Sequence, residues 1–159
     1  MERKIQKSYI YEGLGFPVKL INVPMRKFRG EYLLDVNLNE LQKVVLLMLC
    51  YKKTPLTGNE VSFIRKYFFM TSTQFGDELG VSHVAVLKWE KYGDNIALIV
   101  PTTEYVIRLK TLLHLGRDPI ELKALCESIE LVKLAKYREN KNMKYIPISI
   151  NAKEELCAA

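Results

Sequence analysis

The order of apolar and polar residues predicts a chain built mainly of helices. In its central part, Thr57, Thr71 and Ser82 are typical helix caps, and apolar residues follow each of them at three- and four-residue spacing. A further helix is expected over 102–115, with Gly116 as its stop. The cap, proline and glutamate of residues 118–121 predict the start of one more helix, over 120–134.

The N-terminal part combines strand and helix signals. Val18–Val23 is rich in β-branched residues, Pro24–Gly30 is typical of a basic turn, and Glu31–Val36 is a second candidate strand, so a β-hairpin is the simplest interpretation of residues 8–36. Asn37 then caps a helix in which Val44–Cys50 is apolar almost all round. Such a helix must be covered on more than one side, by the rest of the chain or by a second copy.

Near the C-terminus, the apolar alternation of Ile146, Ile148 and Ile150 indicates a short strand. Pro147 would confine that strand to the edge of a sheet, because proline cannot donate a hydrogen bond to a neighbouring strand. Residues 151–159 are expected to form a tail.

Composition and charge narrow the class of protein. The chain has 159 residues, 48% of them hydrophobic and 26% charged, which is enough for one compact domain or a small domain with additions. The longest apolar run, residues 44–51, is far shorter than a membrane helix, and the charged N-terminus lacks the apolar core of a signal peptide. We therefore expect a cytoplasmic protein without a membrane partner. A net charge of +6 permits nucleic acid binding without proving it.

Few residues are suited to catalysis or to metal binding. Cys50, Cys126 and Cys157 lie far apart, which argues against disulfides and against a zinc site. His83 and His114 have no cluster of cysteines or carboxylates near them at the spacing of metal ligands. The sequence also contains no arrangement of a nucleophile and a general base that is typical of a catalytic site. We predict that the protein is not an enzyme and that it uses neither a metal nor another cofactor.

Residues 71–92 have the layout of a helix-turn-helix, in which two short helices are joined by a turn that contains Gly80. The helices of such a unit cross closely, so the first needs a small residue at the crossing. Gly76 stands there, although glycine is costly inside a helix. The positions expected to face the core are Phe75, Leu79, Val86 and Trp89. The positions left on the outward face of the second helix are His83, Val84, Leu87 and Lys88.

The stretch MTSTQFGDELGVSHVAVLKWEKYG, residues 70–93, resembles the Xre/Cro-type helix-turn-helix family. In the family pattern, a polar cap and Gln come first. An apolar–small–x–x–Leu-Gly-Val-Ser run follows them, and an apolar–x–x–Trp-Glu sequence ends the motif. The residues in register are Gln74, Phe75, Gly76, Leu79, Gly80, Val81, Ser82, Val86, Trp89 and Glu90. The family tends to pair an Arg of its first helix with the Glu that closes the recognition helix, which implies a largely buried Arg65–Glu90 ion pair.

A narrower resemblance extends from Leu56 to about Leu115. The residues LTGNEVSFIRKYFFMTSTQFGDELGVSHVAVLKWEK look like the DNA-binding half of MqsA/YgiT-type antitoxins, whose members typically begin this region with L-T-G-x-E. Tyr9–Val36 is more weakly similar to N-terminal segments of zinc-free relatives in that group. Family members usually have a zinc-binding N-terminal domain with paired cysteines, which this chain does not contain. The resemblance therefore implies DNA binding, whereas toxin neutralisation does not transfer.

The resemblance implies that the helix over 82–90 lies in the DNA major groove. His83 and Lys88 can bond to base edges, and Val84 and Leu87 can contact thymine methyl groups. The alternatives are a solvated His83, a phosphate contact by Lys88 and packing of Leu87 against the domain. The candidates for phosphate contacts are Thr71, Ser72, Gln74, Ser82, Lys91 and Asn95.

The motif has no net charge of its own, because residues 57–92 contain four basic and four acidic residues. The basic excess lies in residues 1–30 and 131–145, so affinity for phosphate comes either from these flanks or from two copies acting together. A homodimer is expected because one recognition helix contacts only a few base pairs. The interface candidates are the helices over 38–49 and 120–134 and the strands of residues 9–36.

The predicted fold class is mainly α: an Xre/Cro-like helix-turn-helix bundle with a small N-terminal β-hairpin or sheet and an additional C-terminal helix. Residues 1–54 would form a dimerisation or partner-binding segment, 55–116 the DNA-binding domain and 117–159 a helix and tail. The predicted function is sequence-specific regulation of transcription, most simply repression, through double-stranded DNA. The alternative is an antitoxin-type module that neutralises a partner toxin and autoregulates its operon.

Overall fold

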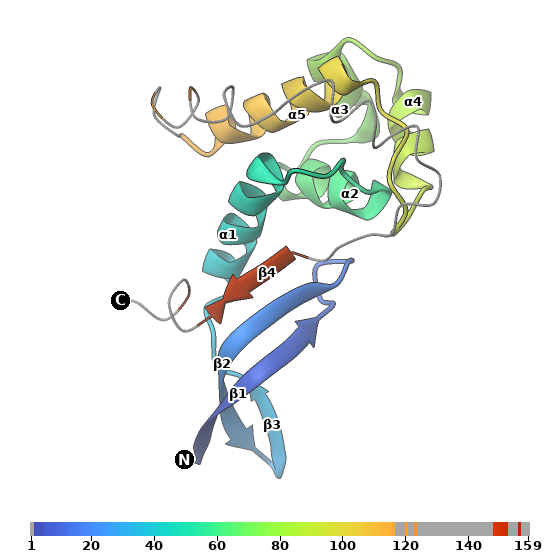
Figure 1. The fold of residues 1–159 in the computed structure, drawn as a ribbon. Coiled ribbons are helices and arrows are strands. Elements are labelled where there is room, and N and C mark those ends of the chain that lie inside the picture. The colour runs from blue at the N-terminus through green and yellow to red at the C-terminus, as the bar shows by residue number, and fades with distance from the viewer. Residues whose placement is uncertain (1, 117–119, 121–122, 124–147, 153–155, 157–159) are drawn as a thin grey trace. The chain divides into compact units, whose positions relative to one another are not determined.

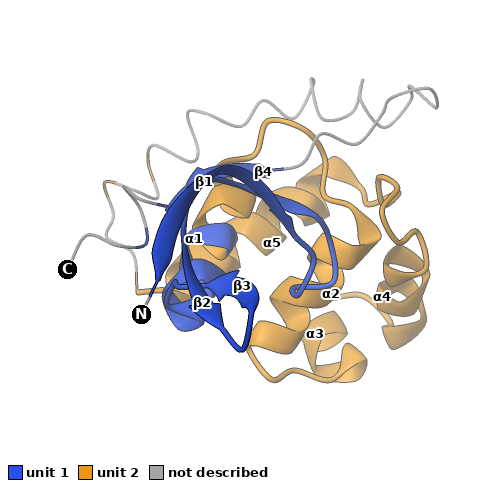
Figure 2. Cartoon of the chain, turned by 90° about the horizontal axis from the view of Figure 1, so that it is seen from below, with its two compact units in different colours: residues 1–45, 146–159 blue, residues 46–145 orange. Residues whose placement is uncertain are grey.

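The computed structural model describes residues 2–116, 120, 123, 148–152 and 156. The chain divides into two compact units, one of residues 1–45 and 146–159 and the other of residues 46–145 (Figure 2). The division falls inside helix α1 (Leu38–Tyr51). No helix in the described ranges is both long enough and apolar enough to cross a membrane. The helix expected over 120–134 and the basic stretch 133–144 lie outside the described residues.

The first unit contains a four-stranded sheet whose central strand is β2 (Val18–Phe28) (Figure 1). Strand β1 (Arg3–Tyr11) pairs with β2 in antiparallel fashion over residues 3–6 and 8–11, and the pairing is interrupted at Lys7, opposite Asn22. The other edge of β2 is shared by two short strands. β4 (Ile148–Asn151) runs parallel to the first residues of β2, and β3 (Glu31–Leu34) runs antiparallel to its last residues.

The prediction of a mainly α chain with a small N-terminal hairpin or sheet is wrong, because the N-terminal sheet is present but is larger than predicted. The described residues form a mixed sheet of four strands, and β2 alone is eleven residues long. β1 gives a strand signal only in its last residues, because the charged residues Arg3, Lys4 and Lys7 interrupt the apolar alternation before Tyr9. β2 continues through the segment that the sequence suggests is a basic turn, and β4 joins it from the far end of the chain.

Local backbone geometry explains how β2 runs through Pro24 to Phe28. The Asp35 N–H donates to the Pro24 carbonyl oxygen at 2.9 Å, so the N–H that proline lacks would face the same edge. That part of the edge lies between the residues of β2 paired with β4 and those paired with β3, which is where a proline is tolerated. The turn itself is only Arg29 and Gly30, whose positive φ angles of 49° and 89° suit a tight hairpin.

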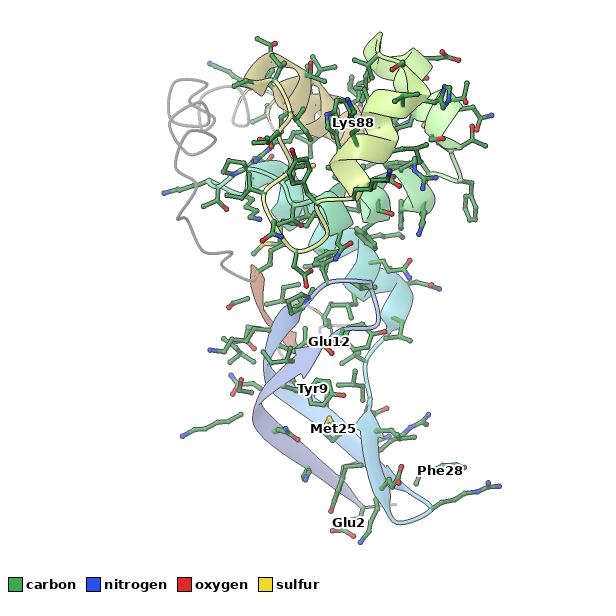
Figure 3. All side chains as sticks on the ribbon, turned by 90° about the vertical axis from the view of Figure 1, so that its right-hand side faces the viewer. Glu2, Tyr9, Glu12, Met25, Phe28 and Lys88 are labelled. Carbon is green, nitrogen blue, oxygen red and sulfur yellow. The ribbon has the colours of Figure 1, made fainter. Side chains whose placement is uncertain are left out.

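Asn22 marks a change in the side of β2 that is buried. Buried side chains stand at even positions up to residue 20 and at odd positions from residue 23, as at Met25 (Figure 3). Asn22 has a φ of 55°, a left-handed conformation that asparagine adopts more readily than most residues. This single residue therefore keeps the apolar side chains of a long, twisted strand on the core side.

The second unit is helical and consists of the end of α1 followed by α2 (Gly58–Tyr67), α3 (Ser72–Leu79), α4 (His83–Glu90) and α5 (Pro101–His114). Thr57 and Thr71 form complete capping boxes with the residues three positions later, and Ser82 caps α4. The core contains apolar side chains from each of these helices, which include Leu49, Ile64, Phe75, Val86 and Leu112.

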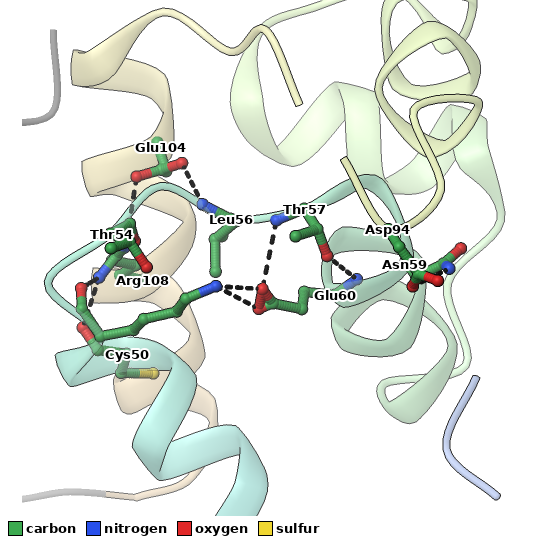
Figure 4. A network of polar contacts seen from close by, with 10 residues as sticks. Cys50, Thr54, Leu56, Thr57, Asn59, Glu60, Asp94, Glu104 and Arg108 are labelled. Carbon is green, nitrogen blue, oxygen red and sulfur yellow. Dashed lines mark hydrogen bonds and ion pairs between the residues drawn. The ribbon is translucent and has the colours of Figure 1, made fainter. Parts of the chain in front are cut away.

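Charged residues fill part of this helical core (Figure 4). Glu104 and Arg108 of α5 form an ion pair at 3.1 Å, with side-chain exposures of 3% and 0%. Arg108 also donates to the backbone carbonyls of residues 50, 52 and 54, and Glu104 accepts from the Leu56 N–H at 2.8 Å. The pair therefore provides hydrogen-bond partners for the backbone groups of the segment that joins α1 to α2.

A second buried pair, Lys52–Glu60, supports the same segment. The Lys52 ammonium donates to both oxygens of the Glu60 carboxylate, at 2.5 and 3.0 Å. One of those oxygens also accepts from the Thr57 N–H, so the carboxylate that caps α2 is also an ionic partner. Burial lowers the pKa of Lys52 and raises the pKa of Glu104, and in each case the ionic partners act in the opposite direction.

Candidate nucleic-acid interface

Helices α3 and α4 approach each other closely at Gly76. A β-carbon placed on Gly76 would lie 2.6 Å from the carbonyl oxygen of Val81, in the turn between the helices. The Val81 N–H in turn donates to the Gly76 carbonyl at 2.9 Å. Any larger residue would push the turn away, so glycine at this position fixes how α4 leaves α3.

The turn between the two helices has the geometry that its residues predict. Gly80 closes α3 in the left-handed conformation, with a φ of 67°. The Ser82 hydroxyl then accepts from the Ala85 N–H at 3.2 Å and starts α4. Both helices are eight residues long, so their short spans are set by caps and turn rather than by propensity alone.

One side of α4 is anchored in the core and the other is exposed. Val86 is fully buried and Trp89 is 8% exposed. All four predicted base-contacting residues lie together on the opposite side, where Lys88 projects from the helix (Figure 3). Val84 is 50% and Leu87 43% exposed, so Leu87 does not pack into the domain, and two apolar side chains stand beside His83 and Lys88.

The predicted phosphate contacts come from three places around α3 and α4. At the start of α3, the Thr71 hydroxyl accepts from the Gln74 N–H at 3.1 Å, and the Gln74 carboxamide oxygen accepts from the Thr71 N–H at 2.9 Å. These groups are therefore engaged in the cap. The donors that remain suited to a phosphate are the Gln74 amide NH2 and the first-turn N–H groups, including that of the half-buried Ser72. Ser82 is exposed at the start of α4.

Lys91 and Asn95 supply the third place, just beyond the end of α4. Lys91 is the C-terminal cap of α4 and is exposed. The Asn95 carbonyl accepts from the Gly58 N–H at 3.2 Å, which fixes the backbone of the loop while the residue remains exposed. The loop after α4 is thus tied to the start of α2.

Arg65 and Glu90 connect the elements that position α4. The Arg65 guanidinium donates to both oxygens of the Glu90 carboxylate, at 2.6 and 3.2 Å, and to the Met70 carbonyl at 2.9 Å. It therefore joins α2, the loop before α3 and the last residue of α4. The two side chains are 14% and 15% exposed, so the pair is mostly buried without being fully removed from water.

Replacing Arg65 with methionine is expected to lower the free energy of unfolding by about 1.5–3 kcal/mol, because Glu90 loses its charged hydrogen-bond donor. The residual exposure of the pair keeps the loss below that of a fully buried ion pair. Urea denaturation measures it. The neighbouring Lys66 is exposed, so Lys66→Met should change stability by less than about 0.5 kcal/mol. Equal losses in the two variants would contradict the role given to Arg65.

The charge around the helix-turn-helix differs from the net charge of zero that is counted for residues 57–92 in the sequence. Two of its four carboxylates are neutralised from outside the window, Glu60 by Lys52 and Glu78 by Lys110 at 2.7 Å. Glu90 is paired with Arg65. Among the described residues, Lys88 and Lys91 form no ion pair, so positive charge remains at the exposed end of α4.

Sequence reasoning missed the residues that produce this distribution. Glu104 and Arg108 have the i,i+4 spacing that is typical of an exposed helix pair, and nothing in the sequence marks them as buried. Lys52 and Lys110 lie outside the motif, and their pairing with Glu60 and Glu78 depends on the tertiary fold. In the sequence, Glu60 stands three residues after the cap Thr57, a spacing that indicates a capping box and not a buried ion pair.

Comparison of the chain with protein-family models, curated proteins and solved structures finds no match.

Proposed function

We propose that this protein is a sequence-specific transcriptional regulator, a repressor that binds double-stranded DNA in the cytoplasm as a homodimer. In this proposal, α4 enters the major groove. The observation that supports it most directly is the exposed face of α4. A short, capped helix is anchored by Val86 and Trp89 and presents hydrogen-bonding and apolar side chains together on its opposite side.

The side chains on this face suit different features of the major groove. Lys88 can donate to O6 and N7 of guanine, and His83 can donate to or accept from base edges. Val84 and Leu87 leave apolar surface in water in the unbound protein, and contact with thymine methyl groups would remove that surface from water. The proposed half-site therefore contains both a guanine and at least one thymine.

The groups around α4 suit the DNA backbone. The first-turn N–H groups of α3 point out of the helix, and their partial positive charge favours a phosphate. Lys91, at the end of α4, adds a full positive charge. These contacts would orient the domain on the duplex without distinguishing sequences, and they predict binding that weakens as salt rises.

The homodimer follows from the small size of a single recognition surface. One eight-residue helix covers only a few base pairs, and two copies that bind half-sites about 34–36 Å apart would cover a palindrome.

Hydroxyl-radical footprinting of the purified protein on its own promoter region tests this proposal. Two protected patches should appear on one face of the duplex, separated by about one helical turn or a multiple of it. A single short patch would indicate a monomer and contradict the dimeric mode. Uniform weak protection would contradict sequence-specific binding itself.

A further inference from the structure

The end of the sheet at which β2 turns into β3 is rich in positive charge. This hairpin end consists of residues 2–4, at the start of β1, and residues 26–34 of β2, the turn and β3, and Figure 3 marks it by Glu2 and Phe28. It contains five basic and two acidic residues. The basic residues, all of them exposed, are Arg3, Lys4, Arg26, Lys27 and Arg29.

Few of these cations are neutralised within the protein. Lys27 donates to the Glu2 carboxylate at 2.9 Å, and Glu2 also accepts from the Tyr32 hydroxyl at 2.6 Å. Arg3 lies 3.5 Å from the Asp35 carboxylate, but its side chain is 71% exposed. The hairpin end therefore keeps a positive charge after its internal pairs are counted. Among the described residues, the cations that form no ion pair are Lys4, Arg26 and Arg29.

Aromatic rings position two of the unpaired cations. The Lys4 ammonium lies 3.8 Å from the centroid of the Tyr32 ring, and the Arg29 guanidinium carbon lies 5.3 Å from the centroid of the Phe28 ring. A guanidinium held against a ring can still donate through the N–H groups in its own plane. Arg29 also occupies the tight turn with a φ of 49°, a conformation that favours glycine or asparagine. The turn therefore does not explain why an arginine stands there.

The proposed recognition surface has little positive charge of its own. Proteins that bind duplex DNA neutralise several phosphates, about 6–10 where the salt dependence is steep. At the exposed end of α4, the unpaired cations among the described residues are Lys88 and Lys91, and Lys88 is assigned to a base edge. Additional phosphate contacts must come from elsewhere in the chain. Arginine suits them, because its paired donors match the oxygens of a phosphate.

We propose that the hairpin end binds the phosphate backbone of the DNA duplex that α4 contacts, through Arg26 and Arg29. This inference rests on the proposed function. Phosphate contacts do not distinguish sequences, so the hairpin end raises the affinity for every duplex, and the discrimination between sequences is left to α4. The observation that supports the proposal is exposed arginine charge that no carboxylate of the described residues neutralises.

The salt dependence of binding tests this proposal. In Arg26→Ala/Arg29→Ala, the slope of the logarithm of the binding constant against the logarithm of salt should become shallower by about 1.8 for each bound copy, because each lost phosphate contact removes about 0.9. At about 0.1 M salt, the affinities for promoter DNA and for a scrambled duplex should fall at least about tenfold, and by the same factor. The thermal melt should not change, since both residues are exposed and unpaired among the described residues.

Two further variants control for charge. Arg26→Lys/Arg29→Lys keeps both positive charges and should retain the wild-type slope. Lys7→Ala/Lys19→Ala removes two exposed charges from other positions of β1 and β2, and its slope should stay close to that of wild type. Equal losses in the two alanine variants, or an unchanged slope in Arg26→Ala/Arg29→Ala, would overturn the proposal. The proposal also fails if that variant keeps its DNA affinity but loses binding to phosphatidylserine vesicles, because the arginines would then serve an anionic membrane surface.

The scrambled duplex separates this proposal from the proposed function. A wild type without preference for promoter DNA would contradict the recognition role of α4. The slope of its binding to the scrambled duplex would still decide whether Arg26 and Arg29 contact phosphates. A wild type that binds neither duplex would overturn both proposals.

Discussion

Replacing Arg108 with leucine is expected to lower the free energy of unfolding by about 3–5 kcal/mol. Arg108 is fully buried, and its guanidinium donates to Glu104 and to the carbonyls of residues 50, 52 and 54. Leucine fills much of the space but leaves the Glu104 carboxylate without its cation and those carbonyls without their donor. Denaturant unfolding followed by circular dichroism measures the loss.

The double variant Arg108→Leu/Glu104→Gln separates the stranded charge from the lost packing. A glutamine at position 104 still accepts from the Leu56 N–H but has no charge to leave unpaired. The double variant should therefore be more stable than Arg108→Leu alone, which is a favourable coupling between the two changes. If the two losses simply add, the ion pair contributes nothing specific and this account of the core is wrong.

The joint replacement of His83 and Lys88 by alanine is expected to weaken binding to the protein's own promoter region by at least about 30-fold. Each good contact to a base edge contributes about 1–3 kcal/mol of discrimination, and the variant removes both hydrogen-bonding side chains of the exposed α4 face. Both residues are exposed, so the thermal melt should not change. Fluorescence anisotropy with labelled promoter DNA measures the affinity.

Lys53→Ala is a matched control for this variant. Lys53 is exposed in the same compact unit, and it precedes α2 rather than lying on α4. Its loss removes one positive charge without touching the proposed base contacts, so promoter affinity should fall only slightly. A comparable fall in Lys53→Ala and in the double variant would show that the binding depends on general charge and not on the face of α4.

The helical unit could be predicted from the sequence because its signals are local. Thr57, Thr71 and Ser82 cap helices where the pattern places them, and Gly80 adopts the left-handed turn that the layout requires. The close approach at Gly76 could also be inferred, because a glycine inside a helix needs a packing reason. These features depend on residues only a few positions apart.

The sheet and the buried charges could not be predicted in the same way. β1 is exposed on much of its surface and contains three cations, so it lacks the alternation of a half-buried strand. β4 pairs with a strand more than a hundred residues earlier in the chain. Glu104 and Arg108 are buried because the segment between α1 and α2 needs donors and acceptors, and no local pattern indicates that need.

The measurement that tests sequence-specific DNA binding most directly is the ratio of affinities for promoter DNA and for a scrambled duplex of the same length and composition. Equilibrium binding of the wild-type protein should be followed at several salt concentrations. The proposal predicts a ratio of at least about 1,000, and the logarithm of the promoter binding constant should fall linearly with the logarithm of the salt concentration. A ratio near one at every salt concentration would contradict the assignment of α4 as a recognition helix.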